Sequence, residues 1–374
     1  MSDTKGVNDE VGRINSEIVQ RSRDARFTAD SIAAWAPRIE ALIIAREGAS
    51  NATVTGLRPV DEAAGGSNGT LLLNARWVSQ DGRAEEAELV LRFLPARGLF
   101  HQYDVKGQFD IQRALAGTPV PVPRQRWLDE RGEFLGVPGY VMDRVAGRSP
   151  PMTWMVSGLF VEASPADRRT MQLAYIDMLA QIHRVDWHAL GLDFMNSRAL
   201  GTRPIERETQ WYWDSLVWCG DTEYLEQLQP IRDWLVRNEP VRARSVLCHG
   251  DTNFGNYLFE GTRITAVVDW EMAFIGHPEC DIAMFIVGNE SLQSHVARPS
   301  GTLTDAEFIS AYEHASGTRM NDWPYYELFA SYRSIVITLL ARQHFDGPFL
   351  QTFNGIARNS VMRTLERGAA LGAC

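Results

Sequence analysis

One stretch of the chain, residues 246–281, constrains the rest: it reads VLCHGDTNFGNYLFEGTRITAVVDWEMAFIGHPECD. It contains two short apolar runs separated by a polar loop that includes glycines. The first run leads into Asp251, and Asn256 follows five residues later. The second run, residues 264–268, ends directly before Asp269. This spacing predicts that Asp251 and Asn256 share one loop and that Asp269 stands at the end of the next strand.

These three side chains suit the chemistry of phosphoryl transfer, which asks for positioning and charge neutralisation more than for covalent help from the protein. A carboxylate orients the attacking hydroxyl, and oxygen ligands hold Mg²⁺ on the phosphates of a nucleotide. Asp251 fits the base, and Asn256 and Asp269 fit the metal ligands. The simpler alternative is that both aspartates are turn residues that cap two strands. The order and spacing of all three residues favour the site.

The pattern H-G-D-x-x-x-x-N followed by D-W-E resembles the catalytic loop and the metal-binding segment of the aminoglycoside phosphotransferase family, a branch of the protein-kinase-like fold. Protein kinases have H-R-D-x-x-x-x-N and D-F-G at these places. Here Gly250 replaces the arginine. The resemblance implies an α+β fold with two lobes, a small antiparallel sheet in the N-lobe and a mostly helical C-lobe, with ATP and Mg²⁺ in the cleft. We interpret His249 as a structural residue of the loop and Asp281 as its buried brace.

The region before this stretch has the layout of a kinase N-lobe. A helix is predicted at residues 29–46, and strands are predicted at residues 52–60, 70–78 and 88–94, with Asp81-Gly82 as the turn between the last two. The glycine-containing loop before the second strand can lay backbone N–H groups over nucleotide phosphates; its residues are Gly66, Ser67, Asn68 and Gly69. We therefore assign residues 1–50 to a tail and packing helices, 51–145 to the N-lobe and 146–374 to the C-lobe.

Arg92 occupies the place on the third strand where kinases carry a lysine that grips the nucleotide. An arginine keeps the positive charge and reaches phosphate oxygens through its planar fork. Because side chains alternate along a strand, Leu91 and Phe93 face away from Arg92. The next helix, residues 107–115, carries Gln108 where kinases have the glutamate that pairs with the lysine. We predict that Gln108 holds Arg92 by a hydrogen bond; a solvated strand arginine is the alternative.

The connection between the lobes is predicted to follow a strand at residues 137–145. By the resemblance, Met142, Asp143 and Val145 belong to the hinge, whose backbone would bind the adenine.

The remainder is predicted to be helical, with starts marked by Ser164-Pro165 and by a capping box at Thr304 and Glu307. The predicted helices cover residues 164–184, 205–218, 224–237, 282–289, 304–315, 324–345 and 353–371. Trp211, Trp270 and Glu271 are candidates to line the acceptor site, and core packing is the alternative for the two tryptophans.

Composition excludes several functional classes. The formal net charge is −10 and no Lys/Arg run occurs, which argues against a nucleic-acid partner. The four cysteines are scattered without a C-x-x-C pair, which argues against a zinc site or a disulfide framework and fits a cytoplasmic protein. The first residues are polar, so no signal peptide is expected. The apolar run at residues 335–341 is too short to cross a membrane.

Two functions of different class remain open. The first is ATP-dependent transfer of the γ-phosphate to a hydroxyl of a small molecule, which the set Asp251, Asn256 and Asp269 favours. The second is a catalytically silent kinase-like protein that binds a nucleotide or a partner, which the Arg92 and Gln108 departures keep open. A His/Asp metallohydrolase lacks further histidines at ligand spacing. The acceptor (an antibiotic, a sugar, an amino alcohol or a hydroxyacyl compound), the choice of ATP or GTP and the oligomeric state stay open.

Overall fold

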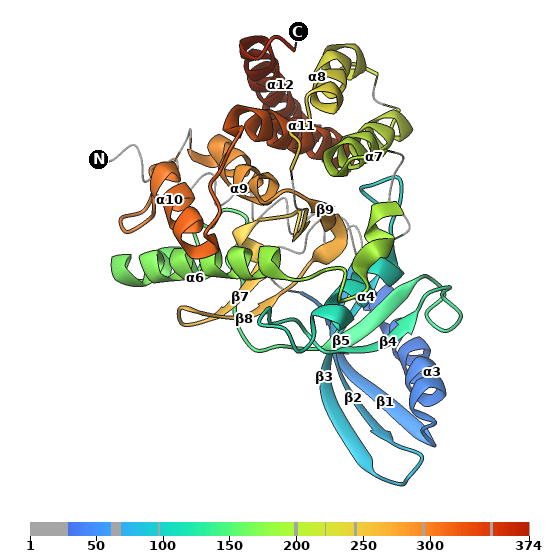
Figure 1. Cartoon of the computed structure of the whole chain (residues 1–374). Coiled ribbons are helices and arrows are strands. Elements are labelled where there is room, and N and C mark those ends of the chain that lie inside the picture. The colour runs from blue at the N-terminus through green and yellow to red at the C-terminus, as the bar shows by residue number, and fades with distance from the viewer. Residues whose placement is uncertain are drawn as a thin grey trace.

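A five-stranded antiparallel sheet forms the first half of the fold, with the strand order β1-β2-β3-β5-β4 (Figure 1). The computed structural model describes residues 29–60, 69–95, 98–197, 201–220, 222–242, 245–293, 296–344 and 347–373. The strands are β1 (Asn51–Pro59), β2 (Gly69–Val78), β3 (Ala84–Phe93), β4 (Gln125–Asp129) and β5 (Gly139–Asp143).

The alternation of side chains along β3 gives the sheet two different faces. Leu89 and Leu91 are buried in the cluster that the sheet forms with α3 (Trp35–Glu47). Val90 belongs to a second cluster, on the face covered by α4 (Val105–Leu115). Arg92 shares the face of Val90, so the predicted separation of Arg92 from Leu91 and Phe93 is confirmed.

The helix predicted at residues 29–46 is divided into α2 (Ala29–Ala33) and α3. α3 ends at Gly48, whose φ of 60° is the left-handed conformation that commonly closes helices. The division into a tail, an N-lobe and a C-lobe stays a prediction. Its boundaries fall between α3 and β1 and shortly after the end of β5.

The second half of the fold is mostly helical, which confirms the α+β, two-lobed, kinase-like class (Figure 1). Two predicted helix starts are confirmed: Ser164 accepts a hydrogen bond from the Asp167 N–H, and Thr304 and Glu307 form a capping box. The helices are α5 (Leu159–Glu162), α6 (Pro165–Arg184), α7 (Pro204–Trp218), α8 (Leu225–Arg237), α9 (Pro278–Gln293), α10 (Asp305–Ser316), α11 (Trp323–Arg342) and α12 (Gly347–Ala370).

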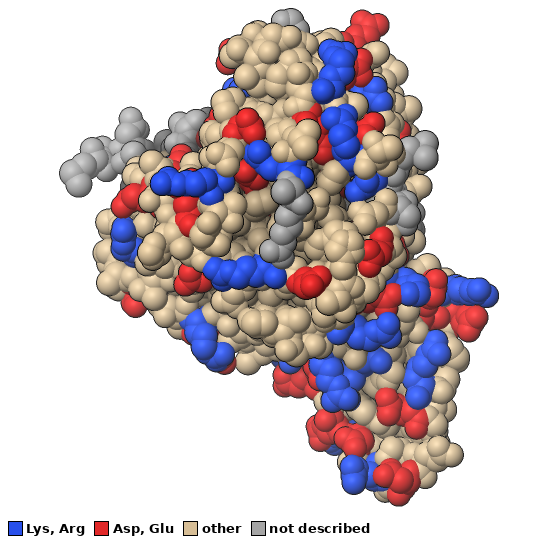
Figure 2. Space-filling view, viewed as in Figure 1, with Lys and Arg blue, Asp and Glu red and all other residues tan. Residues whose placement is uncertain are grey.

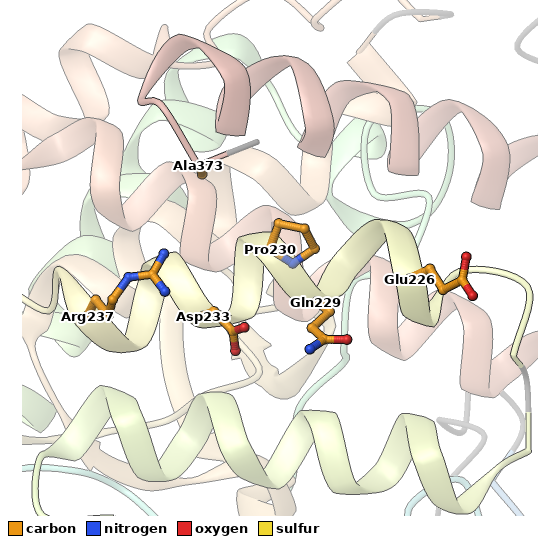
Figure 3. Close-up of a pocket in the computed structure, with 6 residues that line it drawn as sticks. All are labelled: Glu226, Gln229, Pro230, Asp233, Arg237 and Ala373. Atoms are coloured by element: carbon orange, nitrogen blue, oxygen red, sulfur yellow. The ribbon is translucent and has the colours of Figure 1, made fainter.

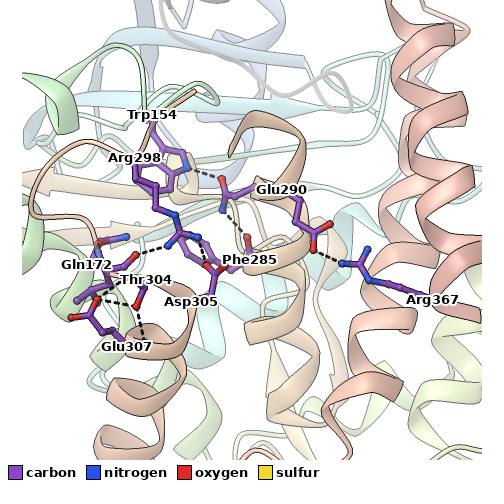
Figure 4. Close-up of polar contacts among 11 residues, drawn as sticks. Trp154, Gln172, Phe285, Glu290, Arg298, Thr304, Asp305, Glu307 and Arg367 are labelled. Carbon is purple, nitrogen blue, oxygen red and sulfur yellow. Dashed lines mark hydrogen bonds and ion pairs between the residues drawn. The ribbon is translucent and has the colours of Figure 1, made fainter. Parts of the chain in front are cut away.

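The segment between α9 and α10 is held by side-chain hydrogen bonds (Figure 4). Arg298 donates from Nη1 to the carbonyl of Leu303 at 2.7 Å and from Nη2 to Asp305 Oδ1 at 2.6 Å. The N–H of Leu303 in turn donates to Gln172 Oε1 on α6 at 2.7 Å. These bonds fix the start of α10 against α6, so the helices around the catalytic segments form a firm support.

Short strands carry the catalytic stretch. β6 (Val246–Cys248) pairs with β9 (Phe274–Gly276), and β7 (Tyr257–Glu260) pairs with β8 (Arg263–Val267) in a hairpin with its turn after Glu260. Leu247 packs into one core cluster of the C-lobe, whereas Val246 and Cys248 pack into another. The loop that holds Asp251 therefore leaves a strand that is buried on both sides.

Candidate active site

Arg92 and Asp269 form a hydrogen-bonded ion pair between β3 and the end of β8. Arg92 Nη2 lies 2.7 Å from Asp269 Oδ1 and 3.9 Å from Glu271 Oε2, and the Arg92 side chain is 10% exposed. Burial alone would lower the pKa of Arg92, but the negative charges of Asp269 and Glu271 raise it, so the guanidinium stays charged. Asp269 has a φ of 67°, a left-handed conformation that glycine adopts routinely and that asparagine and aspartate adopt only occasionally.

The Asp251 carboxylate is held by its own loop. Asn256 Nδ2 donates to Asp251 Oδ2 at 2.9 Å and to the Asp251 carbonyl at 3.1 Å, and the Asn253 N–H donates to Oδ1 at 3.3 Å. Burial and the neighbouring charge of Asp269 raise the pKa of Asp251, against the opposing effects of His249 and the Asn256 hydrogen bond. A carboxylate with a raised pKa is a stronger general base than an ordinary one.

Asp281, at the start of α9, braces this loop from beneath, as predicted. Its carboxylate is fully buried and accepts hydrogen bonds from the N–H of His249 at 2.8 Å, the N–H of Gly250 at 3.0 Å and His183 Nε2 at 3.0 Å. Burial raises the pKa of Asp281, but the hydrogen bonds and the charge of His183 outweigh it, so the pKa is lowered and the carboxylate stays ionised. Two consecutive peptide groups of the loop are thereby fixed.

His249 has the structural role predicted for it. Its Nε2 donates to the carbonyl of Val268 at 2.9 Å, the residue before Asp269. On the other side of the loop, the Tyr175 hydroxyl donates to the carbonyl of Thr252 at 2.6 Å. These bonds tie the Asp251 loop to the Asp269 segment and to α6.

His183, Cys248 and Asp281 present ligand atoms within 4.8 Å of one another, a spacing that a metal ion could use. The polar atoms are already engaged, however. His183 Nδ1 is hydrogen-bonded to the Tyr312 hydroxyl at 2.6 Å, and Cys248 Sγ donates to the carbonyl of His277 at 3.3 Å. We therefore interpret the cluster as a hydrogen-bond network that supports the loop.

Only the last residue of the predicted phosphate-binding loop is among the described residues. Gly66, Ser67 and Asn68 lie outside the described residues, whereas Gly69 opens β2. A Cβ on Gly69 would come within 2.3 Å of the Phe93 ring, so any larger residue there would require this ring to move.

Gln108 does not make the bond predicted for it. Gln108 is buried on α4, but within the described ranges no hydrogen bond joins it to Arg92; Asp269 stands at the guanidinium instead. The prediction is wrong on this point because a carboxylate from the other lobe balances the charge, which an amide cannot do. The neighbouring Gln112 fastens α4 to the sheet by donating to the Tyr140 hydroxyl at 3.2 Å.

The predicted hinge begins in the last two residues of β5, Met142 and Asp143, and continues past the strand to Val145. Met142 is buried, and the N–H groups of Asp143 and Arg144 are bonded at 2.9 Å to the carbonyls of Arg124 and Glu88. The Val145 N–H has no hydrogen-bond partner in the part of the chain that the structure describes. It is therefore the first backbone donor after β5 that is available to a ligand.

The sequence model of the phosphotransferase enzyme family, APH, matches residues 71–329. The chain belongs to this family. Among solved structures, a provisionally assigned aminoglycoside phosphotransferase from Ralstonia eutropha JMP134 is 21% identical, with a TM-score of 0.65 over 89% of this chain and 98% of its own. Aminoglycoside phosphotransferase APH(4)-Ia, in a thermostable mutant form bound to AMP-PNP and hygromycin B, is 16% identical, with a TM-score of 0.54 over 88% and 99%. These likenesses establish the fold.

The curated relatives of this chain are named as acyl-CoA dehydrogenase family members. Acyl-CoA dehydrogenase family member 11 of Rattus norvegicus is 28% identical over 251 residues, which are 63% of this chain and 31% of that protein. The human protein of the same name is 31% identical over 203 residues, 52% of this chain and 24% of its own length. The chain thus spans less than a third of the length of these relatives.

The two tryptophans proposed for the acceptor side are core residues. Trp211 is 3% exposed and packs 4.9 Å from the Phe100 ring, and Trp270 is 1% exposed and donates from Nε1 to the carbonyl of Val267. The packing alternative is therefore the correct one for both. Glu271 lies in the site beside Arg92.

Sequence analysis did not identify His183 as part of the site. The one indication was its position as a histidine on the apolar face of the predicted helix at residues 164–184.

A surface pocket lies outside this site. It runs along α8 and the end of the chain and is lined by Glu226, Gln229, Pro230, Asp233, Arg237 and Ala373 (Figure 3). None of these residues belongs to the APH-family site.

Two further observations concern the distribution of charge and the character of the helices. Acidic and basic side chains are interspersed over the face shown in Figure 2, with no continuous basic patch there. Within the described residues, no helix combines the length and the apolar character that a membrane crossing requires.

Proposed function

We propose that this protein transfers the γ-phosphate of ATP to a hydroxyl of a small molecule. The observation that carries the proposal is the convergence of Asp251, Asn256 and Asp269, with Arg92 bonded to Asp269 at 2.7 Å. A base, two oxygen donors and a cation thus meet where two lobes of a kinase-like fold adjoin, which is the set that phosphoryl transfer uses.

The donor set fits Mg²⁺, which prefers carboxylate and amide oxygens. Asn256 turns its Nδ2 toward Asp251, which leaves the amide oxygen for the metal beside the Asp269 carboxylate. When bound, Mg²⁺ would neutralise charge on the phosphates. Arg92 would bind the same phosphates, and we propose that backbone N–H groups of Gly66, Ser67, Asn68 and Gly69 contribute to their binding. The backbone at Met142, Asp143 and Val145 would hold the adenine.

In the reaction, Asp251 orients the acceptor hydroxyl and accepts its proton. The hydroxyl oxygen bonds to the γ-phosphorus as the bond to the β,γ-bridging oxygen breaks, and ADP leaves.

The acceptor is proposed only by class. The APH(4)-Ia neighbour was solved with hygromycin B, and the curated relatives are named as acyl-CoA dehydrogenase family members. A panel of acceptors therefore needs aminoglycosides, sugars, amino alcohols and hydroxyacyl compounds. We propose a cytoplasmic location, where ATP and such metabolites are present.

The test is ADP release from Mg-ATP, and separately Mg-GTP, across this panel, with the phosphorylated product identified by mass spectrometry. Asp251→Asn should abolish transfer while nucleotide binding persists. Asp214→Asn, an exposed aspartate on α7, is the matched control and should leave turnover unchanged. Equal turnover by Asp251→Asn and the parent would remove Asp251 from the mechanism. Nucleotide binding with no transfer to any acceptor would favour the catalytically silent alternative.

A further inference from the structure

Arg333 is a fully buried cation that touches the catalytic loop. It lies on α11, and its Nη2 donates to the carbonyl of Gly250 at 3.0 Å and to the Tyr212 hydroxyl at 3.1 Å. Gly250 immediately precedes Asp251. Eighty-three residues separate Arg333 from Gly250 in sequence, so only the fold brings them together.

The surroundings of Arg333 are built for a cation. Glu208 Oε1 on α7 lies 3.7 Å from Nη2 and supplies a counter-charge. The guanidinium carbon lies 5.0 Å from the ring centroids of Tyr212 and Phe274 and 5.6 Å from that of Phe329, a range in which aromatic faces attract cations. An apolar side chain of similar volume would fill this space without the cost of desolvating a charge. The retained arginine therefore points to a role beyond packing.

Both hydrogen bonds of Arg333 come from Nη2, and one of them reaches the catalytic loop. Within the described residues, its Nε and Nη1 are buried without a hydrogen-bond partner, so Nη2 alone makes its bonds. The Gly250 N–H donates to Asp281 Oδ1 at 3.0 Å. The two polar groups of Gly250 are thus held by a buried anion from α9 and a buried cation from α11.

This double restraint acts on the residue that precedes the base. The φ of Gly250 is 82°, and its carbonyl belongs to the peptide group that leads into Asp251. Rotation of that peptide group would turn the Asp251 side chain away from the acceptor. The bond from Arg333 opposes such a rotation.

We propose that Arg333 is a positioning residue, which fixes the Gly250–Asp251 peptide so that the Asp251 carboxylate faces the acceptor hydroxyl. The inference rests on the proposed phosphotransferase function. It also makes a physical claim, the restraint of the loop, that can be measured without turnover.

Three variants test it: Arg333→Met, Arg333→Lys and, as the matched control, Arg342→Met. Arg342 also lies on α11, pairs with Glu223 at 3.3 Å and stacks on Tyr224, away from the catalytic loop. Turnover is normalised to the folded fraction. Arg333→Met should lower kcat on the order of tenfold to a hundredfold, as small misplacements of reacting groups do, with little change in the KM for Mg-ATP. Arg333→Lys should recover part of kcat, and Arg342→Met should match the parent.

Hydrogen exchange separates this inference from the proposed function. The amides of residues 249–253 should exchange faster in both Arg333 variants than in the parent and in Arg342→Met, whether or not an acceptor is known. If Arg333→Met does not fold, Arg333→Lys carries the same two measurements. Unchanged exchange in this segment, or an unchanged kcat in a folded Arg333 variant of an active enzyme, would overturn the positioning role. Faster exchange in a protein that transfers no phosphate would support the restraint and reject only the reaction.

Discussion

A Cβ atom placed on Gly250 would lie 1.9 Å from the carbonyl oxygen of Met272. The catalytic loop thus passes directly over the backbone that follows the Asp269 segment. The φ of 82° at Gly250 is a second reason for glycine at this place. The contact sets the separation of the two segments that carry Asp251 and Asp269.

Gly250→Ala should therefore damage both stability and the site. The matched control is Gly261→Ala, at the turn of the β7–β8 hairpin, where φ is 58° and no atom lies within 4 Å of an added Cβ. The control isolates the cost of the left-handed backbone, about 1–2 kcal/mol. Gly250→Ala should lower the free energy of unfolding, measured in urea, by clearly more than Gly261→Ala does, and it should lose nucleotide-dependent turnover. The reason is that the backbone must shift at Met272 to make room for the added Cβ. Equal losses of unfolding free energy in the two variants would show that the loop moves aside for the added Cβ without a further loss of stability.

The sequence predicted those parts of the site that depend on local order. Asp251, Asn256 and Asp269 were recognisable because their spacing is set by one loop and one hairpin. The alternation of β3 likewise placed Arg92 on the face opposite Leu91, and the capping box at Thr304 and Glu307 marked the start of α10.

The contacts that the sequence did not predict are long-range or run against the hydrophobic pattern. The partner of Arg92 lies 177 residues away, on the other lobe, and the bond from His183 to Asp281 spans 98 residues. β3 begins at Ala84, four residues before the predicted strand. The start was missed because the charged residues Glu85 and Glu86 do not fit the apolar pattern on which the prediction was based. α9 begins at Pro278 and not at residue 282, since proline is tolerated in the first turn of a helix.

Asp269→Asn should weaken nucleotide binding in the presence of Mg²⁺ more than in its absence. The amide keeps the shape of the side chain but removes the charge that opposes the metal. It also releases Arg92 from its partner at 2.7 Å, so metal-free binding should be preserved or strengthened. Calorimetric titration of ADP with and without Mg²⁺ measures both. Identical losses in the two titrations would mean that Asp269 is not a metal ligand.

Arg92→Ala should reduce ATP affinity strongly, because it removes a buried cation that would bind the phosphates and leaves Asp269 and Glu271 without their counter-charge. A hydrogen bond to a charged group contributes about 1.5–3 kcal/mol, which corresponds to roughly a tenfold to hundredfold change in affinity. Arg92→Lys should recover part of the ATP affinity that Arg92→Ala loses.

The control for this series is Arg76→Ala on β2, whose ion pair with Glu86 is 74% and 62% exposed and should contribute little. If Arg92→Ala binds ATP as the parent does, the phosphates are held from elsewhere in the lobe.

His277 should make the folded state less stable as the pH falls through mildly acidic values. It is 2% exposed, and its Nδ1 accepts from the Tyr326 hydroxyl at 2.8 Å. Burial, aided by the charge of Arg242, lowers the pKa of His277 from 6.5 to about 4. The unfolded chain therefore binds a proton near pH 6.5, whereas the folded chain does not until about pH 4. Between these values the unfolded state holds more protons, so the free energy of unfolding decreases as the pH falls, by at most about 3 kcal/mol.

His277→Asn keeps an acceptor for the Tyr326 hydroxyl but cannot take up the proton. Its free energy of unfolding, measured in urea across this pH window, should fall less steeply with decreasing pH than that of the parent. His188→Asn is the control. His188 is an exposed histidine paired with Asp193, so its replacement should not change the decrease in stability at low pH that His277 causes. Other buried groups contribute to the slope in every variant, so the comparison with the parent carries the argument. A slope in His277→Asn equal to that of the parent would show that His277 titrates alike in the folded and unfolded states.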